Sequence, residues 1–129
     1  HISDKWGDSV RFVGLPDSSL GQSVAFIGDT DWDGYDEIAV GAPNASESYE
    51  EAGAVYVYAL DELTPGAVYE SVDAIRVLNG EAAGEHSGTA ILGAEDFSGD
   101  GLDDLVIGAS SMDAPLGWNE GGVSIWVSP

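Results

Sequence analysis

An acidic loop followed by a small apolar strand occurs twice in this chain, and this repeat constrains the fold more than any other feature. The first loop is residues 29–37, with the sequence DTDWDGYDE, and the second is residues 96–104, with the sequence DFSGDGLDD. The spacing between the loop starts, Asp29 and Asp96, is the same as the spacing between Gly41 and Gly108 in the strands that follow. A spacing that is kept through both loop and strand indicates an internal repeat.

The alternating carboxylates of the first loop favour a metal site. Asp29, Asp31 and Asp33 can converge only where the backbone curls around a centre, and converged carboxylates repel each other by roughly 1–4 kcal/mol per pair. A hard cation removes this cost. Ca²⁺ accepts about six to eight oxygen ligands in a flexible shell, whereas Mg²⁺ requires stricter geometry and keeps more water. Gly34 allows the sharp bend after the third acid, because glycine adopts positive φ without a steric cost. The loop therefore predicts calcium binding.

Two other interpretations of the loops need to be weighed. Asp and Gly are common in solvated turns for conformational reasons alone, but two loops in register, each before the same kind of strand, favour calcium. An EF-hand needs a bidentate acid at its twelfth loop position and helices on either side. That position is Val40 in the first loop and Ile107 in the second, and strands flank both loops. We therefore reject the EF-hand.

The excess of acidic over basic side chains excludes some classes of binding partner. Its 129 residues include 24 acidic and 3 basic side chains, which give a net charge of −21. Nucleic-acid binding and attraction to an anionic membrane both need Lys and Arg, so we expect no nucleic acid and no membrane insertion. The lack of cysteine excludes disulfides and thiolate metal sites. No signal peptide is visible, so we interpret the chain as a mature segment or an excised piece.

Short strands separated by turns, without an amphipathic helix, predict an all-β chain. After a strand at residues 9–13, the first set of strands is at 21–27, 38–42, 53–58 and 74–78, and the second set is at 88–92, 105–109 and 122–126. The acidic loop lies between the first two strands of each set. Residues 38–42 are small and apolar on both faces, which is typical of a strand between two layers. Residues 61–72 are interpreted as connecting material.

Leu20-Gly21-Gln22-Ser23, the first acidic loop and Val40-Gly41-Ala42-Pro43 together resemble an FG-GAP repeat, the blade unit of the β-propellers in integrin alpha chains and in many bacterial surface proteins. The resemblance covers nearly the whole chain as two tandem repeats. It implies blades of four antiparallel strands, with calcium held in the loop between the first two. It also implies ligands at loop positions one, three, five, seven (a backbone carbonyl) and nine. These are Asp29, Asp31, Asp33, Tyr35 and Glu37, then Asp96, Ser98, Asp100, Leu102 and Asp104.

The chain departs from the family pattern at several positions. The leading aromatic residue of the repeat is replaced by Leu20 in the first unit and by Ser87 in the second. Ser110 stands where the second unit would have its closing proline. Glu37 replaces the usual Asp at position nine, and Asp36 beside it is an alternative ligand. Because Ser98 is a neutral ligand, we expect the second site to be weaker than the first.

Two blades cannot close a ring, since propellers have about four to eight. We divide the chain into residues 1–14, an outer strand that completes another blade, residues 15–80, a first blade, and residues 81–129, a second blade without its outer strand. The N-terminal strand of one copy is then expected to complete the last blade of the next, which gives a head-to-tail homo-oligomer of roughly six or eight blades in total. The alternative is a fragment of a longer propeller.

The resemblance implies a non-enzymatic module for recognition or adhesion, extracellular or on a cell surface, and from the composition we expect a bacterial origin. One structural calcium ion in each loop, two per chain, would stabilise it. The implied partner is an extracellular protein or a glycan, and Trp32 and Trp118 are candidate contacts because they fall in loops. The alternatives are a purely structural self-assembling propeller unit and a fragment of a propeller-containing extracellular enzyme. Against an enzyme, there is no histidine pair, no cysteine and no nucleophile in a recognisable turn.

Overall fold

The computed structural model describes residues 9–111 and 121–127, where the regular structure is β-strand apart from two 3₁₀ turns. The strands are β1 (Arg11–Phe12), β2 (Ser23–Gly28), β3 (Glu37–Ala42), β4 (Ala54–Ala59), β5 (Val68–Tyr69), β6 (Arg76–Asn79), β7 (Ser87–Glu95), β8 (Asp104–Ala109) and β9 (Gly122–Trp126). The 3₁₀ turns are η1 (Leu60–Glu62) and η2 (Ser71–Asp73). No helix among these residues is long and apolar enough to cross a membrane. The predicted all-β class is confirmed.

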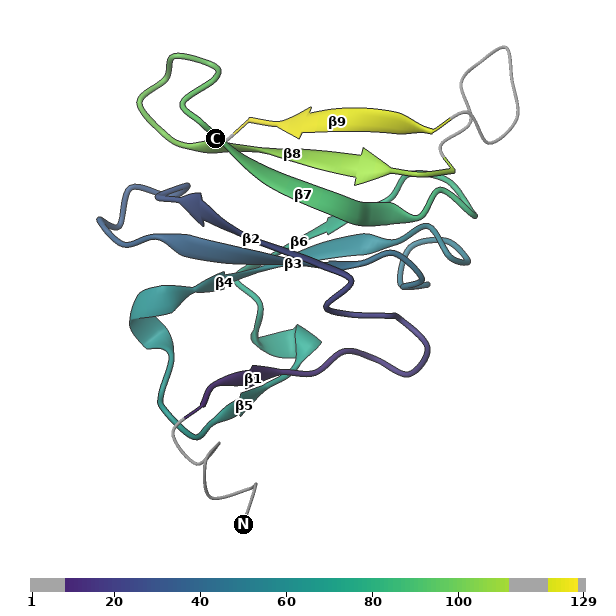
Figure 1. The fold of residues 1–129 in the computed structure, drawn as a ribbon, viewed down its shortest axis with the longest axis horizontal. Helices are drawn as coiled ribbons and strands as arrows, with labels where there is room; N and C mark the ends of the chain where they lie inside the picture. Colours follow the sequence, from purple (N-terminus) through teal and green to yellow (C-terminus); the bar gives the residue numbers. More distant parts are fainter. Residues whose placement is uncertain (1–8, 112–120, 128–129) are drawn as a thin grey trace.

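Two antiparallel sheets hold the repeated strands, and they lie one above the other in Figure 1. The first sheet has the strand order β2-β3-β4-β6, and the second has the order β7-β8-β9. In each sheet the acidic loop joins the first two strands, β2 to β3 and β7 to β8, as the repeat predicts. Both acidic loops therefore lie at the same end of the stacked sheets (Figure 1).

The two central strands of the first sheet, β3 and β4, are buried on both faces, and their residues alternate between two apolar clusters. The cluster between the two sheets contains Ile27, Ala39, Val55, Val57, Leu105 and Ile107. The cluster on the opposite face of the first sheet contains Val40, Ala42, Ala45, Ala54, Tyr56 and Tyr58. This arrangement confirms the prediction that residues 38–42 form a strand between two layers.

Gly41 sets how closely the two sheets approach each other. A Cβ atom at this position would collide with the carbonyl oxygen of Gly88 on β7 and with the hydroxyl of Ser23. That hydroxyl donates a hydrogen bond to the Gly88 carbonyl at 2.7 Å, and Gly53 forms a parallel bridge with Ser87 nearby. The strand after the first loop requires glycine here, because the backbone of the neighbouring sheet occupies the space of a side chain.

A third, small layer covers the other face of the first sheet (Figure 1). It consists of β1 and β5, which pair in parallel, and the ring of Phe12 in β1 lies 4.4 Å from the ring of Tyr58. The interpretation of residues 61–72 as connecting material therefore missed β5. So short a strand cannot show an alternating pattern, and it forms here through its pairing with β1. Completion of another copy's blade by residues 1–14 stays a prediction.

Candidate metal centre

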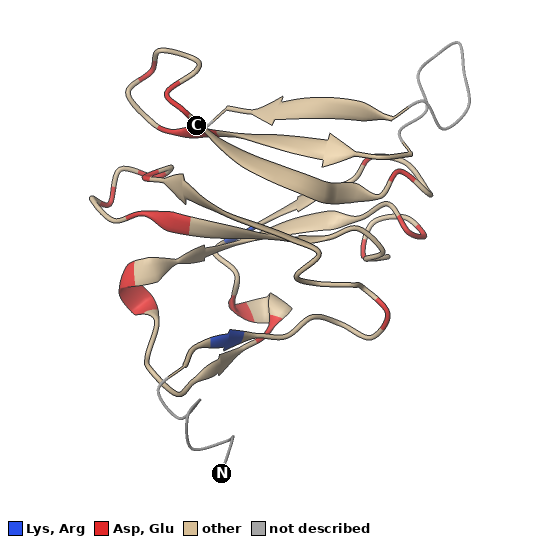
Figure 2. Cartoon of the chain, in the orientation of Figure 1, with Lys and Arg blue, Asp and Glu red and all other residues tan. Residues whose placement is uncertain are grey.

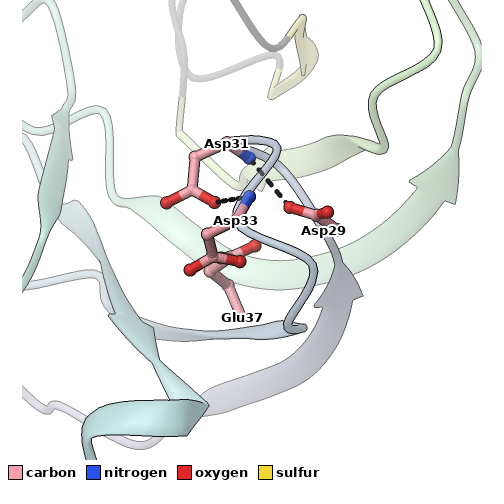
Figure 3. Close-up of side chains that lie close together, drawn as sticks. All are labelled: Asp29, Asp31, Asp33 and Glu37. Atoms are coloured by element: carbon pink, nitrogen blue, oxygen red, sulfur yellow. Dashed lines mark hydrogen bonds between the residues drawn. The ribbon is translucent and has the colours of Figure 1, made fainter.

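Four carboxylates converge in the loop between β2 and β3. Asp29, Asp31, Asp33 and Glu37 each offer one oxygen, and these oxygens all lie within 4.8 Å of one another. Figure 3 shows the three aspartates along the curled loop and Glu37 reaching toward them from the start of β3. The structure thus brings together all four acids that the sequence predicts as ligands of the first site. Such a set of oxygens could hold a metal ion.

The loop curls because each aspartate accepts a hydrogen bond from a backbone N–H two residues further on, the geometry of an Asx turn. Asp29 accepts from Asp31 at 3.3 Å, Asp31 from Asp33 at 3.1 Å, and Asp33 from Tyr35 at 2.8 Å. The second oxygen of Asp29 accepts the Gly34 N–H at 3.0 Å, where φ is +85°. The alternating aspartates, with Gly34, therefore wind the backbone and direct the three aspartate side chains toward one centre.

The backbone hydrogen bonds also keep Asp29 ionised. Partial burial alone would raise the pKa of this carboxyl, but the backbone N–H donors of Gly34, Asp31, Trp32 and Asp33 together outweigh that effect and lower the pKa. The first residue of the loop is therefore an anion before any ion binds. An anionic oxygen at this position suits a divalent cation.

Glu37 is the residue whose surroundings argue most directly for a cation. Its side chain is fully buried, and its Oε2 accepts hydrogen bonds from the N–H of Thr30 at 2.7 Å and from the hydroxyl of Thr30 at 3.1 Å. Its Oε1 is buried without a hydrogen-bond partner. Leaving a buried acceptor unsatisfied costs about 1–3 kcal/mol, and more for a charged group. A hard cation at the centre of the four acids would remove this cost, so the residues present fit such an ion.

Burial of Glu37 also raises its pKa to about 7, and the charges of Asp31 and Asp33 add to the effect. At neutral pH and without an ion, this carboxyl is therefore poised between its two protonation states. A bound cation would favour the ionised form. The sequence did not point to Thr30, which holds Glu37 in place, because a threonine at the second loop position looks like an ordinary turn residue.

Glu37→Gln is expected to change how the stability of the calcium-free protein depends on pH. Since the pKa of Glu37 rises from its ordinary value of 4.5 to about 7, the folded state binds this proton more tightly than the unfolded state. The contribution of Glu37 to stability therefore falls as the pH rises from 4.5 to about 7. Gln does not titrate, so the stability of the variant should not fall for this reason as the pH rises. Melting temperatures in chelator across that range test the prediction, and equal slopes in both proteins would contradict it.

The second loop is organised differently. The carboxylate of Asp96 accepts three backbone hydrogen bonds, at 2.8–3.0 Å, from the N–H groups of Gly99, Asp100 and Gly101. Asp104 is fully buried, like Glu37, and accepts the Ser98 N–H at 2.9 Å. Asp104 thus shares the burial of Glu37, but it accepts an N–H from the third residue of its loop, whereas Glu37 accepts from the second.

The predicted ligands of the second loop do not form a second convergent cluster of acids. Within residues 9–111 and 121–127, the only group of three or more metal-binding side chains drawn together is the one in the first loop. The neutral Ser98 removes one carboxylate from the set, although the Asp100 carboxylate accepts the N–H of Leu102 at 2.9 Å just as Asp33 accepts that of Tyr35. A weaker second site stays a prediction, as do the backbone carbonyl ligands at Tyr35 and Leu102.

Of the two tryptophans proposed as ligand contacts, the structure describes only Trp32. Trp32 lies in the first loop with 68% of its surface exposed. Trp118 lies outside the described residues. A role for Trp32 in contacting a partner is compatible with this exposure and stays a prediction.

Two tandem antiparallel sheets, each with an acidic loop between its first two strands, define a repeat protein of the β-propeller blade class. The chain belongs to the FG-GAP repeat family, whose profile matches residues 20–58 and 87–126. It is 38% identical to integrin alpha-7 of Mus musculus over 114 residues, 86% of this chain and 9% of that protein. It is 34% identical to integrin alpha-5 of Xenopus laevis over 101 residues, 75% of this chain and 9% of that protein. The chain thus spans only a small part of the length of these relatives.

Proposed function

We propose that this chain is a calcium-stabilised, non-enzymatic β-propeller module for recognition or adhesion outside the cell or on its surface. The observation that carries the proposal is the buried, unpartnered Oε1 of Glu37 in the four-carboxylate cluster of the first loop. Asp29, Asp31, Asp33 and Glu37 would hold the ion there, together with the carbonyl of Tyr35. The corresponding set for a second ion comprises Asp96, Ser98, Asp100, Leu102 and Asp104.

Calcium in this proposal is structural. It would supply positive charge where the loop concentrates carboxylates, and the loop residues would hold the β2–β3 hairpin in a single geometry. Figure 2 shows that most of the acidic residues lie in loops, away from the sheet faces. Loops of this kind at one end of stacked sheets offer a surface for a partner, and an extracellular protein or a glycan is the class that we propose.

The family membership supports the proposed role and also limits it. Similarity to integrin alpha chains over most of this chain supports recognition or adhesion as the function. Because the chain corresponds to only 9% of these proteins, their whole activities and partners are not transferred to it. A bacterial origin stays a prediction.

A second candidate function is self-assembly, and the outer face of the second sheet favours it. This face exposes Leu92 (66%), Val123 (67%) and Ile125 (44%). The strand registers make Val123 and Ile125 the counterparts of Val55 and Val57, because each pair lies opposite the equivalent residues of the preceding strand. Val55 and Val57 are fully buried between the two sheets.

The same register argument identifies what would cover the outer face. In the first sheet the equivalent face is covered by the next sheet along the chain. The outer face of the second sheet is therefore suited to a further sheet of the same kind, and we propose that a second copy supplies it in a head-to-tail arrangement. Such contacts form a closed ring when their rotation closes, with roughly six or eight blades in total.

Native mass spectrometry from a calcium-containing buffer is expected to show a trimer or a tetramer with two calcium ions per chain, which corresponds to roughly six or eight blades. The measurement reports the number of chains and the bound metal together. Failure to retain calcium would contradict the metal-binding function. A stable calcium-loaded monomer would contradict self-assembly and would leave a longer propeller as the context of this chain.

A further inference from the structure

The two acidic loops contact each other, although they belong to different sheets. Asp103, at the eighth position of the second loop, donates its backbone N–H to the carbonyl oxygen of Asp29 at 3.1 Å. The Asp103 carboxylate accepts the backbone N–H of Asp29 at 3.0 Å. Asp103 therefore holds Asp29, the first residue of the first loop, at both its N–H and its carbonyl oxygen.

The residues around this contact are shaped to allow it. Gly28 precedes Asp29 and has a φ of +74°, and a Cβ atom there would collide with the carboxylate of Asp103. On the other side of the contact, a Cβ atom at Gly101 would lie 3.2 Å from the ring of Trp32. A glycine thus stands on each side of the contact, Gly28 at the end of β2 and Gly101 in the second loop, so the contact depends on residues from both repeats.

We infer that Asp103 is a positioning residue of the first metal site, and that calcium binding at the two loops is coupled through it. The inference rests on the proposed calcium-binding function. Asp29 is a predicted ligand whose peptide groups on both sides are held by Asp103. The side chain of Asp103 is not one of the four converging acids, so it acts on the site through Asp29.

The position of Asp103 in its own loop accounts for the coupling. It lies between Leu102 and Asp104, which are both predicted ligands of the second site. An ion that orders residues 102–104 would also order the contact with Asp29, and an ion in the first loop would order Asp103 in return. Coupling between two binding sites is reciprocal, because each ligand changes the affinity of the other by the same factor.

Asp36 provides a matched control within the same chain. It occupies the eighth position of the first loop, the position that Asp103 occupies in the second, and it is exposed. Asp36→Ala removes the same charge from the equivalent position, and it does so within the first loop itself. A purely electrostatic effect on the first site should therefore be at least as large for Asp36→Ala as for Asp103→Ala.

Calcium titration calorimetry on the full chain tests the inference. An Asp100→Ala background disables the second site, so that the titration reports the first site alone. In this background Asp103→Ala is expected to weaken calcium binding by about tenfold or more, as is typical for partners that orient metal ligands. Asp103→Asn retains an oxygen that can accept the Asp29 N–H and should restore most of the affinity. Equal affinities for Asp103→Ala and Asp36→Ala would overturn the positioning role.

The coupling itself is measured by comparing the first site with and without a working second site. Asp100→Ala is expected to lower the calcium affinity of the first site about fivefold or more when Asp103 is present, and to have little effect when residue 103 is Ala. Equal effects in both cases would overturn the coupling. If the unmodified chain binds no calcium, both this inference and the proposed function fail. If it binds calcium and only the Asp103 comparisons fail, the proposed function stands and the inference is wrong.

Discussion

Asp33→Ala is expected to lower the melting temperature of the calcium-loaded protein and to leave that of the calcium-free protein nearly unchanged. Asp33 is exposed, and its carboxylate accepts a hydrogen bond from the Tyr35 N–H at 2.8 Å within the loop. Its removal therefore has a modest effect on the protein without calcium and also relieves repulsion among the four acids. With calcium present, the variant loses a ligand.

The size of this effect follows from the linkage between binding and folding. At a calcium concentration about 100 times the dissociation constant, one site adds about 2.7 kcal/mol to the free energy of unfolding. Losing that contribution would lower the melting temperature by roughly 10 °C in a domain of this size. Thermal unfolding in calcium and in chelator gives both values. Asp36→Ala serves as the control, because it removes an acid from the same loop that is not one of the four converging acids. Equal losses in calcium and in chelator would refute a metal role for Asp33.

Leu105→Ala is expected to destabilise the protein by about 2–5 kcal/mol, whether or not calcium is present. Leu105 is fully buried in the cluster between the two sheets, where it packs with residues of both repeats. Truncation removes apolar contacts and leaves a cavity that Ala39, a small residue of the same cluster, is unable to fill. Denaturant unfolding of the variant measures the loss.

Leu92→Ala is the matched control for Leu105→Ala. It makes the same substitution in the same sheet, but on the outer face, where Leu92 is 66% exposed. In a monomer its effect should stay within about 0.5 kcal/mol, as for other surface substitutions. If the two variants lose similar stability, the apolar cluster between the sheets is not the main core. In an assembly that covers the outer face, Leu92→Ala should weaken association while leaving the fold of the single chain intact.

Much of the first site could be predicted from the sequence because its geometry is local. Asp29, Asp31 and Asp33 each accept a hydrogen bond from the N–H two residues along the chain, so the spacing of the residues specifies the curl of the loop. The central strands were also predictable, since a strand with two buried faces has a nearly continuous run of apolar residues. The constant spacing of the repeat then linked the two loops and their strands without any knowledge of the packing.

The tertiary structure decided which acids are buried and which residues join the two repeats. Glu37 has a raised pKa because β3 places it in the interior, and nothing in the loop sequence indicates that burial. The contact between Asp103 and Asp29 joins residues 74 apart in the sequence. This contact forms because the second sheet packs closely on the first. At Gly41 the backbone of the second sheet occupies the space that a side chain would fill.

The second loop and β5 also show features that the sequence did not predict and that the tertiary structure decided. The repeat predicts equivalent loops, and the first aspartate of each loop accepts backbone N–H groups, but the acids of the second loop do not converge as those of the first loop do. The strand β5 exists through its pairing with β1, although the whole first sheet apart from β6 lies between them in the sequence. Local hydrogen bonds and the alternation of residues along a strand depend on residues that are close together in the sequence. The sequence by itself therefore determined the repeat, the strands and the first set of candidate ligands. Burial and contacts between distant segments depend on how the sheets pack, and only the tertiary structure decided these.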